Sequence, residues 1–173
     1  MHLVVDVVGA YVPQTVAVAA GRLETLSGGA QRALDTRERL APFAPGETRT
    51  IDLSAVGLPS GASAAVVSLV ATEAAVGYWT AFPTSQPAPL ASSMNIDRPG
   101  QTRSAQAIVA LNGGSRSIQV FSQSGGHLVV DVAGWFTGRA APVSTEGLFV
   151  ASNPTRVLDT RDRFPIAPWG GST

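Results

Sequence analysis

Two pairs of imidazole and carboxylate side chains are the first candidates for chemistry in this sequence. His127 and Asp131 stand four residues apart in GHLVVDVAGWF, and His2 and Asp6 stand four apart in HLVVDVVGAY. On a β-strand such residues share one face, so either pair could form an acid–base or metal-binding couple. However, no third ligand has a suitable spacing, and the only two histidines occupy the same place in two copies of one motif. We therefore expect Asp131 to be a partly buried carboxylate held by arginine or by backbone donors.

A second repeated motif places a carboxylate, a hydroxyl and a guanidinium side by side. It reads DTR at Asp35 to Arg37 and again at Asp159 to Arg161. The cluster could form a calcium loop, but each copy has only one or two acidic side chains, which is too few for a strong site. We expect instead that an Asp–Arg ion pair fixes the end of a strand, with Arg37 also a natural partner for Asp131.

The aromatic residues allow one further binding site. Trp79 and Trp135 could provide flat faces on which the apolar side of a pyranose ring would stack. Packing in the core is the alternative, and we expect it for Phe136 and for at least one tryptophan. The sequence contains no GxSxG elbow, P-loop or dinucleotide fingerprint, and no histidine remains outside the repeated motif to serve as a base. We therefore expect a protein without catalytic residues, cofactor or metal.

Composition narrows the possible partners. The 173 residues carry 12 basic and 12 acidic side chains, so a nucleic-acid partner is not expected. All 12 basic residues are arginine and cysteine is absent, which excludes lysine-based chemistry, disulfides and thiolate metal sites. No apolar run is long enough to span a membrane. The first residues lack the features of a signal peptide, so we expect any export signal to lie outside this sequence.

The motifs recur with one period. From His2 to His127 is 125 positions, and from Arg32 to Arg156, which open RALDTR and RVLDTR, is 124. A repeat of about 125 residues fits both pairs. The order of the motifs predicts the closing strand of a preceding repeat and a connector over 1–21, a complete repeat over 22–138, and a linker with the opening strands of a following repeat over 139–173.

Alternating apolar residues and regularly spaced turn signals predict β-strands throughout. Helix formers are frequent in 64–75, but its β-branched residues favour a buried strand. We expect 92–97 and 103–111 to form a hairpin-like pair around Pro99-Gly100, and the strand over 2–8, apolar on both faces, to lie inside a sandwich. The fold class is therefore all-β, an antiparallel β-sandwich or jelly-roll-like unit of about eight strands. The predicted strands are 2–8, 32–37, 47–53, 64–75, 77–83, 92–97, 103–111, 115–122 and 126–136, with 14–20 a short strand or connector.

These motifs, in this order, resemble a known repeat. RALDTR, VVSLVATEAAVGYWTAFP, ASSMNIDRPGQTRSAQAIVAL and HLVVDVAGWF are similar to the repeat found in many exported proteins of actinobacteria and some neighbouring phyla, where it occurs in tandem or attached to secreted hydrolases. The resemblance implies an all-β fold and an extracellular or cell-surface location, and it supplies no catalytic residues. This chain differs from many relatives in lacking a cysteine pair.

Two functions follow as expectations. The first is a non-catalytic structural unit that joins copies of itself or neighbouring repeats head to tail, by strand complementation, into a stalk, fibre or layer. This expectation comes from the partial repeats at both ends, whose strand edges need cover. The alternative is that the two ends fold back and complete one larger domain within the chain. The second is a module that binds carbohydrate of the cell wall through Trp79 or Trp135.

Overall fold

The structure is a computed structural model that describes residues 4–38, 41–112 and 114–160. Strands make up almost all of its regular structure, and they pair in antiparallel fashion. The described residues contain one short 3₁₀ helix, η1 (Ser54–Val56). The absence of α-helix from this part of the chain agrees with the alternating apolar pattern of the sequence.

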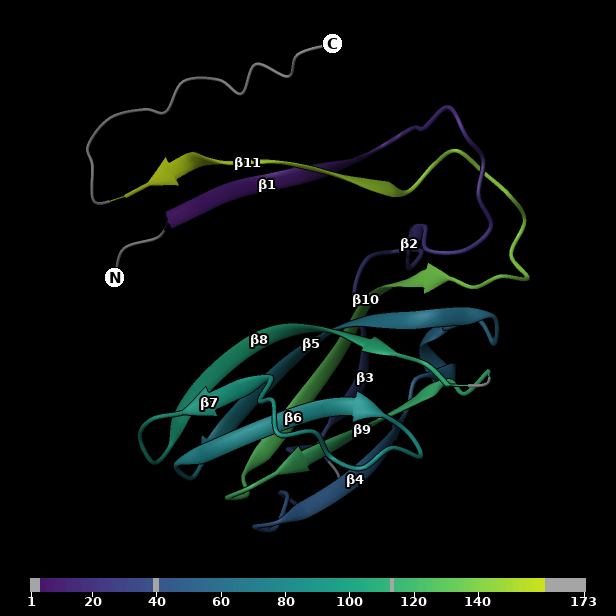
Figure 1. Ribbon diagram of the computed structural model, residues 1–173. Helices are drawn as coiled ribbons and strands as arrows, with labels where there is room; N and C mark the ends of the chain where they lie inside the picture. Colours follow the sequence, from purple (N-terminus) through teal and green to yellow (C-terminus); the bar gives the residue numbers. More distant parts are fainter. Residues whose placement is uncertain (1–3, 39–40, 113, 161–173) are drawn as a thin grey trace.

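Two sheets pack face to face and form a sandwich, called the body below (Figure 1). The first sheet has the order β2-β10-β5-β8, and β3 also pairs with β10; the second has the order β4-β9-β6-β7. This confirms the predicted all-β sandwich. The strands of the body are β2 (Leu23–Thr25), β3 (Gln31–Asp35), β4 (Glu47–Asp52), β5 (Ala62–Ala74), β6 (Gly77–Pro83), β7 (Met94–Ile96), β8 (Gln101–Ala110), β9 (Ser117–Ser122) and β10 (His127–Thr137).

Strand β5 lies at the centre of the first sheet, between β10 and β8. Its alternate residues Ala65, Val67 and Leu69 are fully buried, whereas the residues between them are only partly buried. This period of two is the signature of a strand with one face on the core, and it confirms β-structure where helix formers could have competed. On β6 of the second sheet, Trp79 is fully buried and belongs to the same core.

The turn at Pro99-Gly100 does not close a hairpin, and the prediction of one is wrong. Strand β7 pairs with β6 in the second sheet, whereas β8 pairs with β5 in the first. The turn therefore carries the chain from one sheet to the other. A turn within a hairpin and a turn between two sheets give the same sequence signal, because turn residues fix a change of direction but not the partner of the next strand.

A separate two-stranded ribbon consists of β1 (Val4–Val12) and β11 (Leu148–Asp159), and it extends away from the body (Figure 1). The expectation that the first strand lies inside a sandwich is therefore wrong. Its single described strand partner is β11, and apolar side chains of the ribbon remain exposed because no second sheet of residues 4–38, 41–112 and 114–160 covers them. Val5 is 37% exposed, Tyr11 45% and Phe149 49%.

Two connecting segments, residues 13–21 and 138–147, join the ribbon to the body and are called the stem. They are held together by the backbone N–H of Gln14, which donates to the carbonyl of Thr145 at 2.9 Å, and by an isolated bridge between Val18 and Ser144. The hydroxyl of Thr137, at the end of β10, donates to the carbonyl of Ala19 at 2.7 Å. Segment 14–20, predicted as a short strand or connector, is thus a connector.

Candidate functional site

The repeated motifs meet along one line of strand pairing in the body. Strand β10 carries β3 and then β2 along one edge, and β5 along the other. We call the pairing of β10 with β3 and β2 the body seam. It brings the LDTR motif beside the VVDV motif, although about 100 residues separate them in the sequence. The spacing of Asp35 and Asp131 in the chain therefore says nothing about their proximity in the fold.

Arginine and aspartate side chains line the body seam. Asp131 accepts hydrogen bonds from Arg32, at 2.5 Å from Nε and 3.3 Å from Nη2. The same guanidinium donates to Asp35 at 2.8 Å, so that Arg32 lies between two carboxylates. Asp131 is thus held by an arginine, but the expected partner Arg37 is wrong. Arg32 is the partner because β3 pairs with β10 through Arg32 opposite Asp131.

Arg37 instead binds the carboxylate of its own motif. Its Nε donates to Asp35 at 2.8 Å, and its backbone N–H donates to the same oxygen at 3.0 Å, which closes a local turn at the end of β3. The Asp35 side chain is only 2% exposed. The hydrogen bonds from Arg37 outweigh the effect of burial and hold the pKa of Asp35 well below its usual range. A group fixed in its charged form in this way serves structure better than proton transfer.

The histidine of the motif bonds to a buried threonine. Nδ1 of His127 lies 3.0 Å from Oγ1 of Thr36, which also accepts the backbone N–H of Leu128 at 2.9 Å. Thr36 is fully buried, so its hydroxyl satisfies groups that water cannot reach. His127 and Asp131 thus have different partners, and the acid–base interpretation of this pair gains no support from the geometry.

Seven pairs of the body seam recur in the ribbon, although the residues passed over after Val7 are 152–154 of β11, whereas those passed over after Val132 are 26–30, between β2 and β3. The same irregularity occurs in both: the pairing skips one residue of the LDTR strand, Ala33 beside Asp131 in the body and Val157 beside Asp6 in the ribbon. Each of these seven ribbon pairs has a counterpart in the body. Near the LDTR motif these are Val4–Asp159 with Val129–Asp35, Val5–Leu158 with Val130–Leu34, Asp6–Arg156 with Asp131–Arg32, and Val7–Thr155 with Val132–Gln31. Further along they are Gly9–Ala151 with Gly134–Thr25, Ala10–Val150 with Trp135–Glu24, and Tyr11–Phe149 with Phe136–Leu23.

We call the pairing of β1 with β11 the ribbon seam. Its backbone places Asp6 opposite Arg156, and Asp159 opposite Val4. The predicted residues His2 and Arg161 lie outside the described residues, so the ion pairs expected for this copy stay predictions.

The two seams differ at their second edge. In the body, β10 pairs with β5 from His127 to Thr137, so both of its edges are satisfied. In the ribbon, the described part of the chain places no strand on the edge of β1 that faces away from β11. Val130 is fully buried, whereas its counterpart Val5 is 37% exposed. An open strand edge with exposed apolar residues is a surface to which another strand can add.

The two predicted sugar-stacking residues have different environments. Trp79 is 1% exposed and packs edge-on against Phe43, with ring centroids 5.0 Å apart. Its proposed stacking role is therefore wrong, because a core side chain offers no face to a ligand. Trp135 is partly exposed and lines a hollow of about 400 Å³ between β10, β2, the stem and the turn before β5.

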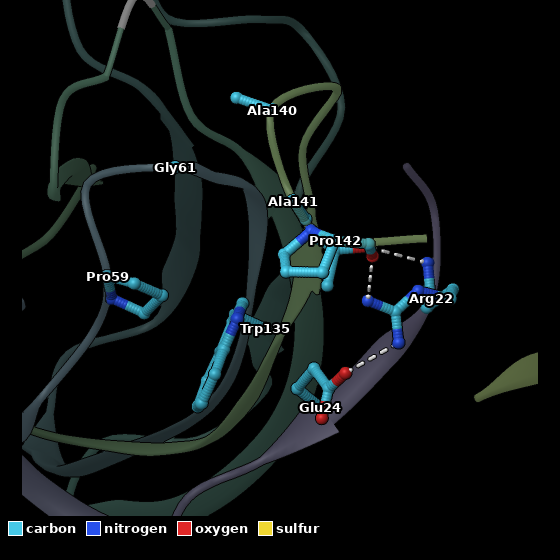
Figure 2. Close-up of a pocket in the computed structure, with 9 residues that line it drawn as sticks. Arg22, Glu24, Pro59, Gly61, Trp135, Ala140, Ala141 and Pro142 are labelled. Carbon is cyan, nitrogen blue, oxygen red and sulfur yellow. Dashed lines mark hydrogen bonds and ion pairs between the residues drawn. The ribbon is translucent and has the colours of Figure 1, made fainter. Parts of the chain in front are cut away.

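Figure 2 shows the Trp135 ring in this hollow, between Pro59 on one side and Pro142 on the other. Arg22 closes one wall, because its guanidinium donates to Glu24 at 2.8 Å and to the carbonyl of Pro142 at 3.0 Å. The Glu24 side chain is 42% exposed. The hollow therefore combines an aromatic ring, two prolines and one accessible carboxylate.

The ribbon carries different residues at the positions that correspond to this hollow. By the shared register, the place of Trp135 is taken in the ribbon by Ala10 and that of Glu24 by Val150. The sequence singled out Trp135 but not Arg22 or Glu24, which carry no motif. Arg32 was also missed, although its recurrence as Arg156 in the second LDTR copy was a usable signal.

The described residues thus form an antiparallel β-sandwich with a ribbon that repeats one of its seams. Among these residues, no group of three or more His, Cys, Asp or Glu side chains could hold a metal ion. No helix found within them is long and apolar enough to cross a membrane. No family model, curated protein or solved structure matches this chain.

Proposed function

We propose that this chain is a non-catalytic structural repeat that joins neighbouring units through its ribbon, by strand complementation, into a stalk, fibre or layer. The units it joins are copies of itself or neighbouring repeats. The resemblance of its motifs to an exported repeat supports a location outside the cell or at the cell surface for this function. The charged side chains of the seam serve in this proposal to fix strand register.

One observation carries the proposal: among the described residues β1 has a strand on one edge only, whereas its counterpart β10 has strands on both. The open edge leaves backbone N–H and C=O groups without strand partners, and these template the addition of another strand. Tyr11, Phe149 and Leu158 remain 38 to 49% exposed on the same ribbon. Strand addition satisfies the backbone groups and covers apolar surface at the same time.

Light scattering of the chain at increasing concentration tests this function. The proposal predicts growth in mass and its suppression by the double substitution Val5→Lys/Val7→Lys, because lysine along a strand edge opposes pairing. Val16→Lys is a matched control, since Val16 is 68% exposed in the stem and outside the strands. A chain that stays monomeric at millimolar concentration contradicts the proposal.

The hollow at Trp135 favours a second function, the binding of cell-wall carbohydrate. The indole ring provides a stacking face for a pyranose ring, and the exposed Glu24 carboxylate can accept hydrogen bonds from sugar hydroxyls. Binding to purified cell wall that is lost in Trp135→Ala and retained in Phe149→Ala supports this function. Equal binding by both variants contradicts it.

A further inference from the structure

The body seam shows what covers the second edge of a strand of the β10 type. In the body that neighbour is β5, which pairs with β10 along its whole length. The pairs at the centre are Val130–Leu69, Asp131–Ser68 and Val132–Val67. Val130, Val132, Val67 and Leu69 are all fully buried, so this pairing completes the core as well as the hydrogen-bond ladder.

Strand β1 reproduces β10 in three respects. It has the same sequence motif, the same partner motif on one edge, and the same skipped residue in the pairing. A one-residue slip of register would turn every side chain to the opposite face, so agreement over seven pairs is a strong constraint. A strand that adds to the open edge of β1 is therefore expected to pair in the register that β5 has on β10.

We infer that the open edge of β1 is the docking edge for a β5-type strand of a neighbouring repeat unit, with Val5, Asp6 and Val7 opposite the counterparts of Leu69, Ser68 and Val67. This inference rests on the proposed function and names its partner. The partner strand has apolar residues towards the core and a mixture of valine and small polar residues on the other face, as β5 does with Ala65, Val67 and Leu69 on the first face and Val66 and Ser68 on the second.

A second intact copy is not the matched partner. Its β5 already lies between β10 and β8, so neither edge of that strand is open. Intact copies can meet only through other edges, such as β1 against β1 or β1 against the outer edge of β8. These contacts bring the chains together without the register of the body. A partner whose β5-type edge is open gives both the backbone ladder and the buried valine contacts.

The absence of cysteine from the chain allows a direct test of register. The full chain with Val7→Cys is mixed, under mild oxidation, with a synthetic peptide of residues 62–74. The peptide carries a single cysteine in place of either Val67 or Ser68, and two arginines at its end for solubility. Because neighbouring side chains point to opposite faces, we expect cross-linking at position 67 to be at least ~10-fold faster than at 68. Val16→Cys, in the stem, measures random collision.

Nuclear magnetic resonance of the unmodified chain supplies a second readout, with the peptide of residues 62–74 that keeps both Val67 and Ser68. We expect saturable shifts of backbone amides confined to residues 4–12, with the amides of β8 and β10 unchanged. Equal cross-linking at positions 67 and 68, shifts at β8, or no binding at millimolar peptide overturns the inference. The proposed function is tested separately: growth in mass through β1 without peptide binding contradicts the inference alone, whereas peptide binding by a strictly monomeric chain contradicts the self-association alone.

Discussion

A pair of equivalent valines allows the burial of the two seams to be compared by one substitution. Val130 and Val5 occupy the same place in their motifs, but Val130 is fully buried and Val5 is 37% exposed. Val130→Ala removes two buried methyl groups, worth about 0.8 kcal/mol each, and leaves a cavity, so we expect a loss of about 2–3 kcal/mol in the free energy of unfolding. For Val5→Ala no closed cavity forms, and we expect a loss of about 1 kcal/mol or less.

Urea unfolding followed by tryptophan fluorescence measures the difference, because Trp79 lies in the core of the body. At about 2–4 °C per kcal/mol for a chain of this size, Val130→Ala should also lower Tm by roughly 4–12 °C. Equal losses of unfolding free energy for the two variants would refute the claim that the body buries Val130 and the ribbon leaves Val5 partly exposed. A loss below about 1 kcal/mol for Val130→Ala would refute the packing argument for β10.

Three further predictions concern the body. Gly134→Ala places a Cβ 2.5 Å from the carbonyl oxygen of Glu24, and we expect it to cost about 1–3 kcal/mol of stability in urea, whereas Gly61→Ala, with open space at its Cβ, should have little effect. Because the pKa of Asp35 is lowered in the folded state, its charged form stabilises the fold above about pH 4. Asp35→Asn should therefore lower Tm at pH 7. The difference in Tm from the parent chain should shrink as the pH falls below about 4. Arg37→Ala should lower Tm at pH 7 by removing the main cause of that shift, and an unchanged Tm would contradict the structural role of this ion pair.

Much of the fold could be predicted because alternation is a local signal. In 64–75 helix formers are frequent, but the β-branched residues indicate the strand that the structure has as β5 (Ala62–Ala74). Strand β2 was not predicted, because its three residues, Leu23–Thr25, show too little alternation and become a strand only by pairing with β10. The separation of β7 and β8 into different sheets is likewise a matter of partners, which the turn at Pro99-Gly100 does not specify.

The seam could be predicted in outline but not in its pairs. The repeat of the LDTR and VVDV motifs indicated that they belong together, yet Arg32 and Arg37 are equally plausible partners of Asp131 until the register is known. The same limit applies to the tryptophans. Trp79 and Trp135 both occur in strand-like segments, and only the packing of the two sheets makes the first a core residue and the second a wall of a hollow.

The central claim is that the ribbon seam has the register of the body seam and leaves the second edge of β1 open. Cross-strand nuclear Overhauser effects between backbone protons of the chain test it most directly. The account predicts contacts for the pairs Val5–Leu158 and Ala10–Val150, with the same skipped residue as in Val130–Leu34, and fast amide exchange for alternate residues of β1. Contacts of β1 with any strand of the body, or with β11 in another register, would contradict it.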